Sequence, residues 1–196
     1  MSDVKEVAGL EIKELTIEQI REIYAERIPK DFVPDEIKPL SRIEEALSKG
    51  HYACYGAFDG NLITSYAFFI INGDDALLDY LAVREDLRGN GTGSEFLQGM
   101  RAGLLRRFER VLLESENPDY AETDDDRKTR ERRLQFYRKN GLMETGVLST
   151  VWNVPYRVLQ FPDGKSLSAD ETREVYRGLY KVLLPEELCK KMVCVQ

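Results

Sequence analysis

LLDYLAVREDLRGNGTGSEFL, residues 77–97, reads as an apolar strand, a short charged loop, three glycines within five residues and the start of a helix. A turn of this kind gathers several unpaired backbone N–H groups at the first turn of the helix, where the helix dipole is positive. Such a place suits a bound pyrophosphate. This stretch therefore predicts a phosphate-binding loop between a strand and a helix.

Two other phosphate-binding motifs do not fit these glycines. A dinucleotide fingerprint, G-x-G-x-x-G counted from Gly89, requires a glycine where Ser94 stands. A nucleoside triphosphate loop requires a lysine after its last glycine, and none is there. The pattern that fits is R-x-x-G-x-G from Arg88 to Gly93. A plain turn with Arg88 on the surface stays open as the structural alternative.

The residues on either side of the loop predict an α/β chain with a mixed sheet. Apolar runs predict strands at residues 10–15, 52–58, 62–71, 77–83 and 111–115, and a closing hairpin within residues 142–161. Tight turns between the second, third and fourth strands predict an antiparallel meander. The helix that connects residues 77–83 to 111–115 forms a crossover, which predicts that these two strands are parallel.

Helical periodicity predicts helices at residues 94–108 and 124–140, the second ending at Gly141. Capping-box patterns predict that three further helices begin at Thr16, Ser41 and Ser168. The helix from Ser41 is expected to stop at Gly50.

Prolines divide the rest of the chain. Three of them within residues 29–39 predict an ordered loop instead of a continuous helix, and this loop carries Asp31, Phe32, Asp35 and Glu36. Residues 162–164, Pro-Asp-Gly, predict a break before the C-terminal helix, which is expected to be interrupted at Pro185. Loops of this kind often line binding sites.

Composition excludes several classes of protein. With 196 residues the chain fits one globular domain, and its three cysteines and single histidine suggest neither a disulfide framework nor a zinc site. A net charge of −7 argues against a nucleic-acid partner. No apolar run approaches the roughly 20 residues of a membrane span, and residues 1–10 lack the features of a signal peptide. The sequence predicts a soluble, cytoplasmic protein.

The ordered set of elements, with the R-x-x-G-x-G loop and the segment FYRKNGL at residues 136–142, resembles the GNAT superfamily of N-acetyltransferases. The resemblance covers most of residues 10–161. It implies a GNAT acyl-CoA N-acyltransferase fold with splayed central strands, in residues 1–162. Residues 163–196 are then a C-terminal helical extension, packed on the domain or on a second copy in a homodimer.

The resemblance implies acetyl-CoA as cosubstrate and no metal. In the family the pyrophosphate lies on the loop amides, and N–H groups of the preceding strand polarise the thioester carbonyl. By motif match, the cofactor-binding residues are Leu81, Ala82, Val83, Arg88, Gly89, Asn90, Gly91, Thr92, Gly93 and Ser94.

The same resemblance implies catalytic residues. Tyr137 matches the tyrosine of the family's F-Y-x-x-x-G segment and is the candidate general acid for the departing thiolate; the alternative is a core aromatic residue. Glu114 and Glu116 are candidate general bases, because they lie on and just after the second splayed strand. Asp79 and Tyr80 are rival contributors.

The acceptor is expected to be a primary amine on a small cationic molecule. Residues 114–126 hold seven acidic residues and no basic one, which suits a cation, although a solvated loop explains the same charges. A protein lysine or N-terminus, a larger acyl chain, and a non-catalytic acyl-CoA-binding module are the alternatives.

Overall fold

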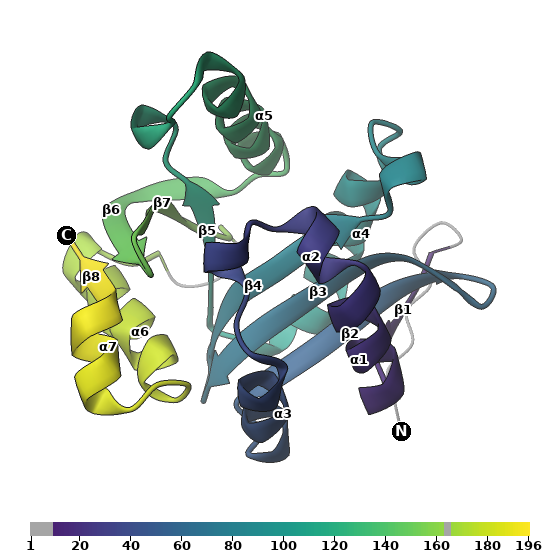
Figure 1. Cartoon of the computed structure of the whole chain (residues 1–196), viewed down its shortest axis with the longest axis horizontal. Coiled ribbons are helices and arrows are strands. Elements are labelled where there is room, and N and C mark those ends of the chain that lie inside the picture. Colours follow the sequence, from purple (N-terminus) through teal and green to yellow (C-terminus); the bar gives the residue numbers. More distant parts are fainter. Residues whose placement is uncertain (1–9, 163–165) are drawn as a thin grey trace. The chain divides into compact units, whose positions relative to one another are not determined.

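The computed structural model describes residues 10–162 and 166–196. Eight strands form one sheet in the order β1-β2-β3-β4-β5-β7-β6-β8, and helices connect several of them along the chain (Figure 1). The α/β class predicted from the sequence is therefore confirmed. The predicted break at residues 162–164 lies outside the described ranges except for residue 162. Of the first ten residues, only residue 10 is described. The described residues divide into two compact units, which are taken in turn below.

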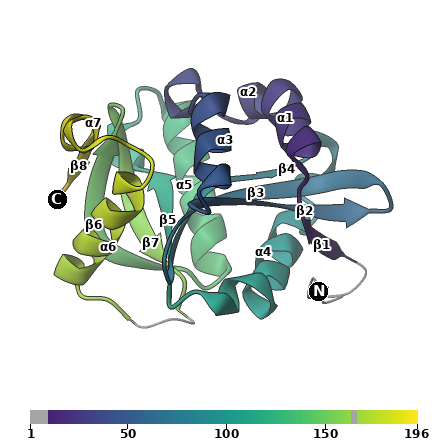
Figure 2. The same ribbon diagram turned by 90° about the horizontal axis from the view of Figure 1, so that it is seen from below.

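Unit 1 comprises residues up to Phe69 together with Leu78–Arg107. Its helices are α1 (Ile17–Glu26), α2 (Ile28–Asp31), α3 (Leu40–Ser48) and α4 (Thr92–Ala102). Its strands are β1 (Glu11–Glu14), β2 (Tyr52–Asp59), and parts of β3 (Leu62–Asn72) and β4 (Asp75–Val83). Strand β1 pairs antiparallel with β2. Within this unit, α1–α3 cover one face of the strands and α4 covers the other (Figure 2).

Local sequence explains how these helices begin and pack. Thr16 closes the predicted capping box with Gln19, so α1 starts where the sequence indicates. Helix α4 approaches β1 closely at Gly99. A Cβ atom added there would lie only 2.7 Å from Cδ1 of Ile12. Any larger residue at position 99 therefore requires a shift of the helix or of Ile12.

Three predictions within unit 1 are wrong in detail. Helix α3 begins at Leu40 after Pro39 and has no side-chain cap, so the expected box at Ser41 does not form; proline at the boundary sets the start instead. Residues 29–39 are not wholly loop, since they include most of α2 and a 3₁₀ turn at Pro34–Glu36. The helix expected over residues 94–108 ends at Ala102, before Gly103.

Unit 2 comprises Ile70–Leu77 and the residues from Phe108 onward. It holds β5 (Arg110–Glu116), α5 (Asp124–Lys139), β6 (Met143–Val151), β7 (Val154–Gln160), α6 (Ala169–Lys181), α7 (Glu186–Met192) and β8 (Val193–Val195). Strand β7 pairs antiparallel with both β5 and β6, which confirms the closing hairpin. Helices α5 and α6 lie on opposite sides of these strands (Figure 1).

Turn chemistry fixes the ends of the hairpin and of α5. Trp152 and Asn153 link β6 to β7 with φ angles of 48° and 68°, the pair of left-handed residues that a tight hairpin turn requires. Gly141 follows α5 with a φ of 89°, as predicted for a helix that ends at a glycine.

The C-terminal segment contains an element that the sequence analysis missed. The capping box at Ser168 forms with Glu171, and Pro185 separates α6 from α7 as expected. Residues 193–195 then form β8, which pairs antiparallel with β6. Because α6 packs against β6 and β8 extends the sheet, the segment is part of unit 2 and is not purely helical.

The predicted parallel pairing of residues 78–83 with 111–115, and the splaying of these strands, stay predictions. None of the helices within residues 10–162 and 166–196 combines the length and the apolar character needed to cross a membrane.

Candidate functional site

The glycine loop of unit 1 has the backbone shape that its sequence predicts. After β4, a 3₁₀ turn at Glu85–Leu87 leads to Arg88, and α4 begins at Thr92. Gly89 and Gly91 have φ angles of 80° and 89°, in the region that favours glycine, and Gly91 is the N-cap of α4. The bend is therefore built from two left-handed glycines at the start of a helix.

The backbone at this bend has free amides and open space beside its glycines. Ser94 and Glu95 donate the first intrahelical hydrogen bonds, both to the Gly91 carbonyl oxygen, at 2.8 and 3.0 Å. The N–H groups of Thr92 and Gly93 therefore precede the first helical bond. A Cβ atom added at Gly91 would meet nothing within 4 Å, so a ligand can approach the backbone there. The loop fits an anionic group such as a pyrophosphate.

Two of the predicted cofactor residues already donate their backbone N–H groups to carbonyl oxygens nearby in the chain. The Arg88 N–H donates to the Glu85 carbonyl oxygen at 3.2 Å, and the Ser94 N–H is the helical donor already described. The middle of the motif, Gly89 to Gly93, is thus the part best placed to donate to a ligand. Leu81, Ala82 and Val83 lie at the end of β4, one turn before the loop.

The Arg88 side chain folds back onto its own unit. Its Nε donates to the Val83 carbonyl oxygen at 2.9 Å, and its Nη2 forms an ion pair with Asp31 at the end of α2. Asp31 also accepts a hydrogen bond from the Tyr66 hydroxyl at 2.8 Å. The sequence placed Asp31 in a loop but gave no sign of this partnership, because 57 positions separate it from Arg88.

The rival residues Asp79 and Tyr80 hold the segment after α2 to β4. The Asp79 side chain is only 2% exposed and forms an ion pair with Lys38 at 2.6 Å, and it also accepts from the Tyr52 hydroxyl. The Tyr80 hydroxyl accepts from the Lys38 N–H and donates to the Glu36 carbonyl oxygen, both at 2.8 Å. Burial raises the pKa of Tyr80, although the Lys38 charge opposes this, so its hydroxyl stays protonated.

The candidate base Glu114 lies in unit 2, in contact with α6. Its carboxylate accepts hydrogen bonds from the hydroxyls of Tyr176 and Tyr180, the latter at 2.9 Å to Oε1 and 3.0 Å to Oε2. The Tyr176 hydroxyl also lies 2.9 Å from Ser149 Oγ. Burial and the Glu114 charge raise the pKa of Tyr176 well above its usual value, so this residue remains a donor.

Glu116 and Tyr137 have different surroundings in the same unit. The buried carboxylate of Glu116 pairs with Arg133 and, at 3.4 Å, with Arg130, both on α5. Tyr137 lies on the buried side of α5, 7% exposed, with its ring edge-on to Phe136 at 5.3 Å between centroids. This packing is compatible with a core aromatic residue and with a phenol that acts in catalysis.

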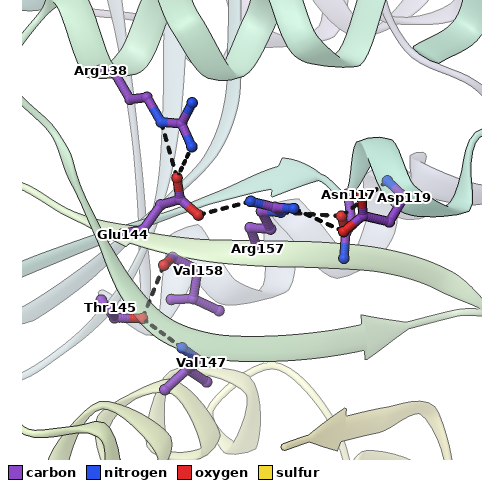
Figure 3. Close-up of polar contacts among 8 residues, drawn as sticks. All are labelled: Asn117, Asp119, Arg138, Glu144, Thr145, Val147, Arg157 and Val158. Atoms are coloured by element: carbon purple, nitrogen blue, oxygen red, sulfur yellow. Dashed lines mark hydrogen bonds and ion pairs between the residues drawn. The ribbon is translucent and has the colours of Figure 1, made fainter.

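A charged network that the sequence analysis missed links α5, β6 and β7. The Arg157 guanidinium donates to Glu144, Asn117 and Asp119 at 3.0, 3.1 and 2.8 Å, and Glu144 also accepts from Arg138 at 2.9 Å (Figure 3). Burial opposes the charge on Glu144, but the hydrogen bonds from the two arginines lower its pKa below the usual value.

The structure thus brings the predicted cofactor residues together in unit 1 and places Glu114, Glu116 and Tyr137 in unit 2. Within the described ranges, no group of three His, Cys, Asp or Glu side chains is arranged to hold a metal ion.

No protein-family model and no curated protein matches this sequence. Solved structures do match. An acetyltransferase of the GNAT family from Bacteroides thetaiotaomicron is 20% identical and aligns over 87% of this chain and 94% of its own, with a TM-score of 0.67. The ribosomal-protein-S18-alanine N-acetyltransferase of Escherichia coli is 16% identical, with coverages of 81% and 96% and a TM-score of 0.55.

An aminoglycoside 6′-N-acetyltransferase complexed with coenzyme A is 20% identical to this chain. It aligns over 76% of this chain and 94% of its own, with a TM-score of 0.57. At these identities the likeness concerns the fold. The chain therefore has the fold of the GNAT acetyltransferases, as its sequence resemblance implied.

Proposed function

We propose that this protein is an N-acetyltransferase that moves an acetyl group from acetyl-CoA to a primary amine. The observation that carries the proposal is the bend at Gly89 and Gly91, which precedes the first turn of α4 in the connection from β4 to α4 of a GNAT fold. Backbone amides at such a helix start bind phosphate groups. Acetyl-CoA supplies both the diphosphate that this bend would hold and the thioester that an amine attacks.

The chain's own residues would serve the transfer in separate roles. The N–H groups from Gly89 to Gly93 bind the diphosphate, and those of Leu81 to Val83 polarise the thioester carbonyl. Tyr137 donates a proton to the departing thiolate. Each role is testable, because each names one group.

Of the two candidate bases, Glu114 is favoured over Glu116. The contacts of Glu114 include two neutral tyrosine hydroxyl groups, whereas the contacts of Glu116 include two permanently charged guanidinium groups. A carboxylate that takes up the amine proton suits the first environment better than the second.

A small cationic amine is the acceptor class that we favour. The net charge of −7 attracts cations, and this charge is the main support, since Glu116 and Asp119 of the acidic stretch 114–126 already pair with arginines. The likeness to an aminoglycoside 6′-N-acetyltransferase agrees with a small molecule. The likeness to an enzyme named for a ribosomal-protein alanine keeps a peptide N-terminus as the second candidate.

A thiol-release assay with acetyl-CoA tests the function. The protein is offered a polyamine, an aminoglycoside, a lysine peptide and a peptide with a free N-terminal alanine, each beside a reaction without protein. Release of coenzyme A with the first two amines supports the proposal, and release with a peptide alone moves the acceptor to the second candidate. Binding of acetyl-CoA without turnover on any amine would instead indicate a non-catalytic binding module.

A further inference from the structure

We infer that Asp31, which no motif marks, is a positioning residue for the acyl-CoA loop and sets its affinity through Arg88. The inference rests on the proposed function, because it assumes that the loop binds a CoA species. Asp31 ends the short helix α2, far in sequence from the loop that begins at Arg84. All the contacts that carry the argument lie within unit 1.

Asp31 is held rigidly on one side. Its side chain is 9% exposed, and its Oδ2 accepts the hydrogen bond from Tyr66, a fully buried residue of β3. The Arg27 guanidinium carbon lies 4.7 Å from the centre of the Tyr66 ring, and Arg27 Nη1 donates to the Ile63 carbonyl oxygen at 3.0 Å. Because these groups belong to packed elements, the carboxylate has a fixed position.

On its other side Asp31 holds the loop. Its Oδ1 pairs with Arg88 Nη2, and Arg88 Nε binds the Val83 carbonyl oxygen at 2.9 Å. The guanidinium therefore ties the residue before Gly89 to the end of β4 and to α2. Two left-handed glycines follow, and glycine backbones lose much conformational entropy when they are ordered. A fixed Arg88 reduces the entropy that a ligand must remove on binding.

Charge alone predicts the opposite effect. A carboxylate near an anion-binding loop repels phosphate, so removal of the Asp31 charge would tighten CoA binding if electrostatics decided the affinity. Positioning through Arg88 predicts weaker binding. The sign of the change separates the two explanations.

Isothermal titration with CoA, at a temperature where every variant is folded, tests the inference. Asp31→Asn should raise the Kd about tenfold, the usual effect of losing a hydrogen bond between charged groups. Asp86→Asn is the matched control, because it removes an exposed ion pair with Arg84 in the same loop. Its Kd should stay within about twofold of the wild-type value.

Two further variants test the route of the effect. The double variant Asp31→Asn/Arg88→Gln should bind CoA no more weakly than Arg88→Gln alone, because Asp31 acts through Arg88. Tyr66→Phe, which removes the hydroxyl that anchors Asp31, should also weaken binding, and it carries the test if Asp31→Asn fails to fold. An unchanged or lower Kd in the folded Asp31 and Tyr66 variants, or additive losses in the double variant, would overturn the inference. A wild-type protein that binds no CoA would overturn the proposed function itself.

Discussion

Position 91 requires glycine because of its backbone conformation and not because of crowding. Its φ of 89° is costly for any residue with a Cβ atom, yet the space beside it is open. Gly91→Ala should therefore cost about 1 kcal/mol of stability through strain, and it should weaken CoA binding because the loop relaxes toward a different bend. Urea unfolding and calorimetry measure the two effects.

Gly60→Ala is the control for that prediction. Gly60 has a φ of 58° and equally open space, but it lies in the turn between β2 and β3. It should lose a similar amount of stability and keep its affinity for CoA. Equal affinities in both variants would show that the bend at Gly91 is not used for binding.

A substitution at Tyr137 distinguishes a catalytic role of this residue from a packing role. If its phenol protonates the thiolate, Tyr137→Phe should lower turnover by about 10²-fold while the Kd for acetyl-CoA changes little. Steady-state kinetics with a responsive amine and calorimetry give the two values. Tyr120→Phe, at an exposed tyrosine of the same unit, should leave both unchanged. Full turnover in Tyr137→Phe would support the core-aromatic alternative.

At the scale of single residues, the sequence predicts the roles of residues whose partners are close to them in the chain. Gly89 and Gly91 show their role because the strand, loop and helix around them are adjacent in sequence. Asp31 does not, because its partners Tyr66 and Arg88 reach it only after the chain has folded. The tyrosines that contact Glu114 were hidden for the same reason, since Tyr176 lies 62 positions away.

At the scale of elements, the contact between α5 and the hairpin of β6 and β7 predicts a pH dependence. Arg138 and Arg157 lower the pKa of Glu144, so its charge stabilises the folded state above the pKa of an unfolded glutamate, about 4.3. This stabilisation is lost as the pH falls through the lower, folded-state pKa. Because the site is partly exposed, the contribution at neutral pH should be about 1 kcal/mol or less.

Glu144→Gln tests this contribution. The variant should unfold at a lower temperature than the wild type at pH 7. The difference should shrink as the pH falls below the pKa of an unfolded glutamate, and it should vanish below the lowered pKa of Glu144 in the folded state, where the wild-type carboxylate is protonated. Asp170→Asn, which breaks an exposed i,i+3 pair with Arg173, serves as the control with little effect. A difference that persists unchanged at pH 3 would assign the effect to packing.

Helix starts show why some elements were predictable. Thr16 and Ser168 cap their helices because each has an extended backbone and forms both hydrogen bonds of its capping box. At Ser41 the preceding Pro39 already fixes an extended backbone and is itself the N-cap, so the helix begins two residues earlier than a box at Ser41 requires. Strand β8 was missed because three residues are too few to show a period.

At the scale of the whole chain, the C-terminal helix α6 forms hydrogen bonds with the strands β5 and β6. Tyr176 of α6 is fully buried and contacts Glu114 of β5 and Ser149 of β6. Tyr176→Phe should lower the free energy of unfolding of unit 2 by about 1–3 kcal/mol, because both partners lose a buried hydrogen bond. Urea unfolding measures the change, with Tyr120→Phe again as the neutral control. A loss no larger than that of the control would show that the hydroxyl contributes nothing to stability.

Most of the strands and helices could be anticipated from the chain as a whole, because most have their own local pattern; α2 and β8 are too short to show one. The division into two units could not, since it cuts through β3 and β4, which read as continuous strands in the sequence.

The hairpin turn at Trp152 has a practical consequence. The turn contains the one tryptophan of the sequence. The backbone N–H of Trp152 donates a hydrogen bond to the Met192 carbonyl oxygen at 3.1 Å. Intrinsic fluorescence excited at the indole band is thus a reporter of the C-terminal half alone, and melting of the glycine loop at residues 88–93 has to be followed by another spectroscopic signal.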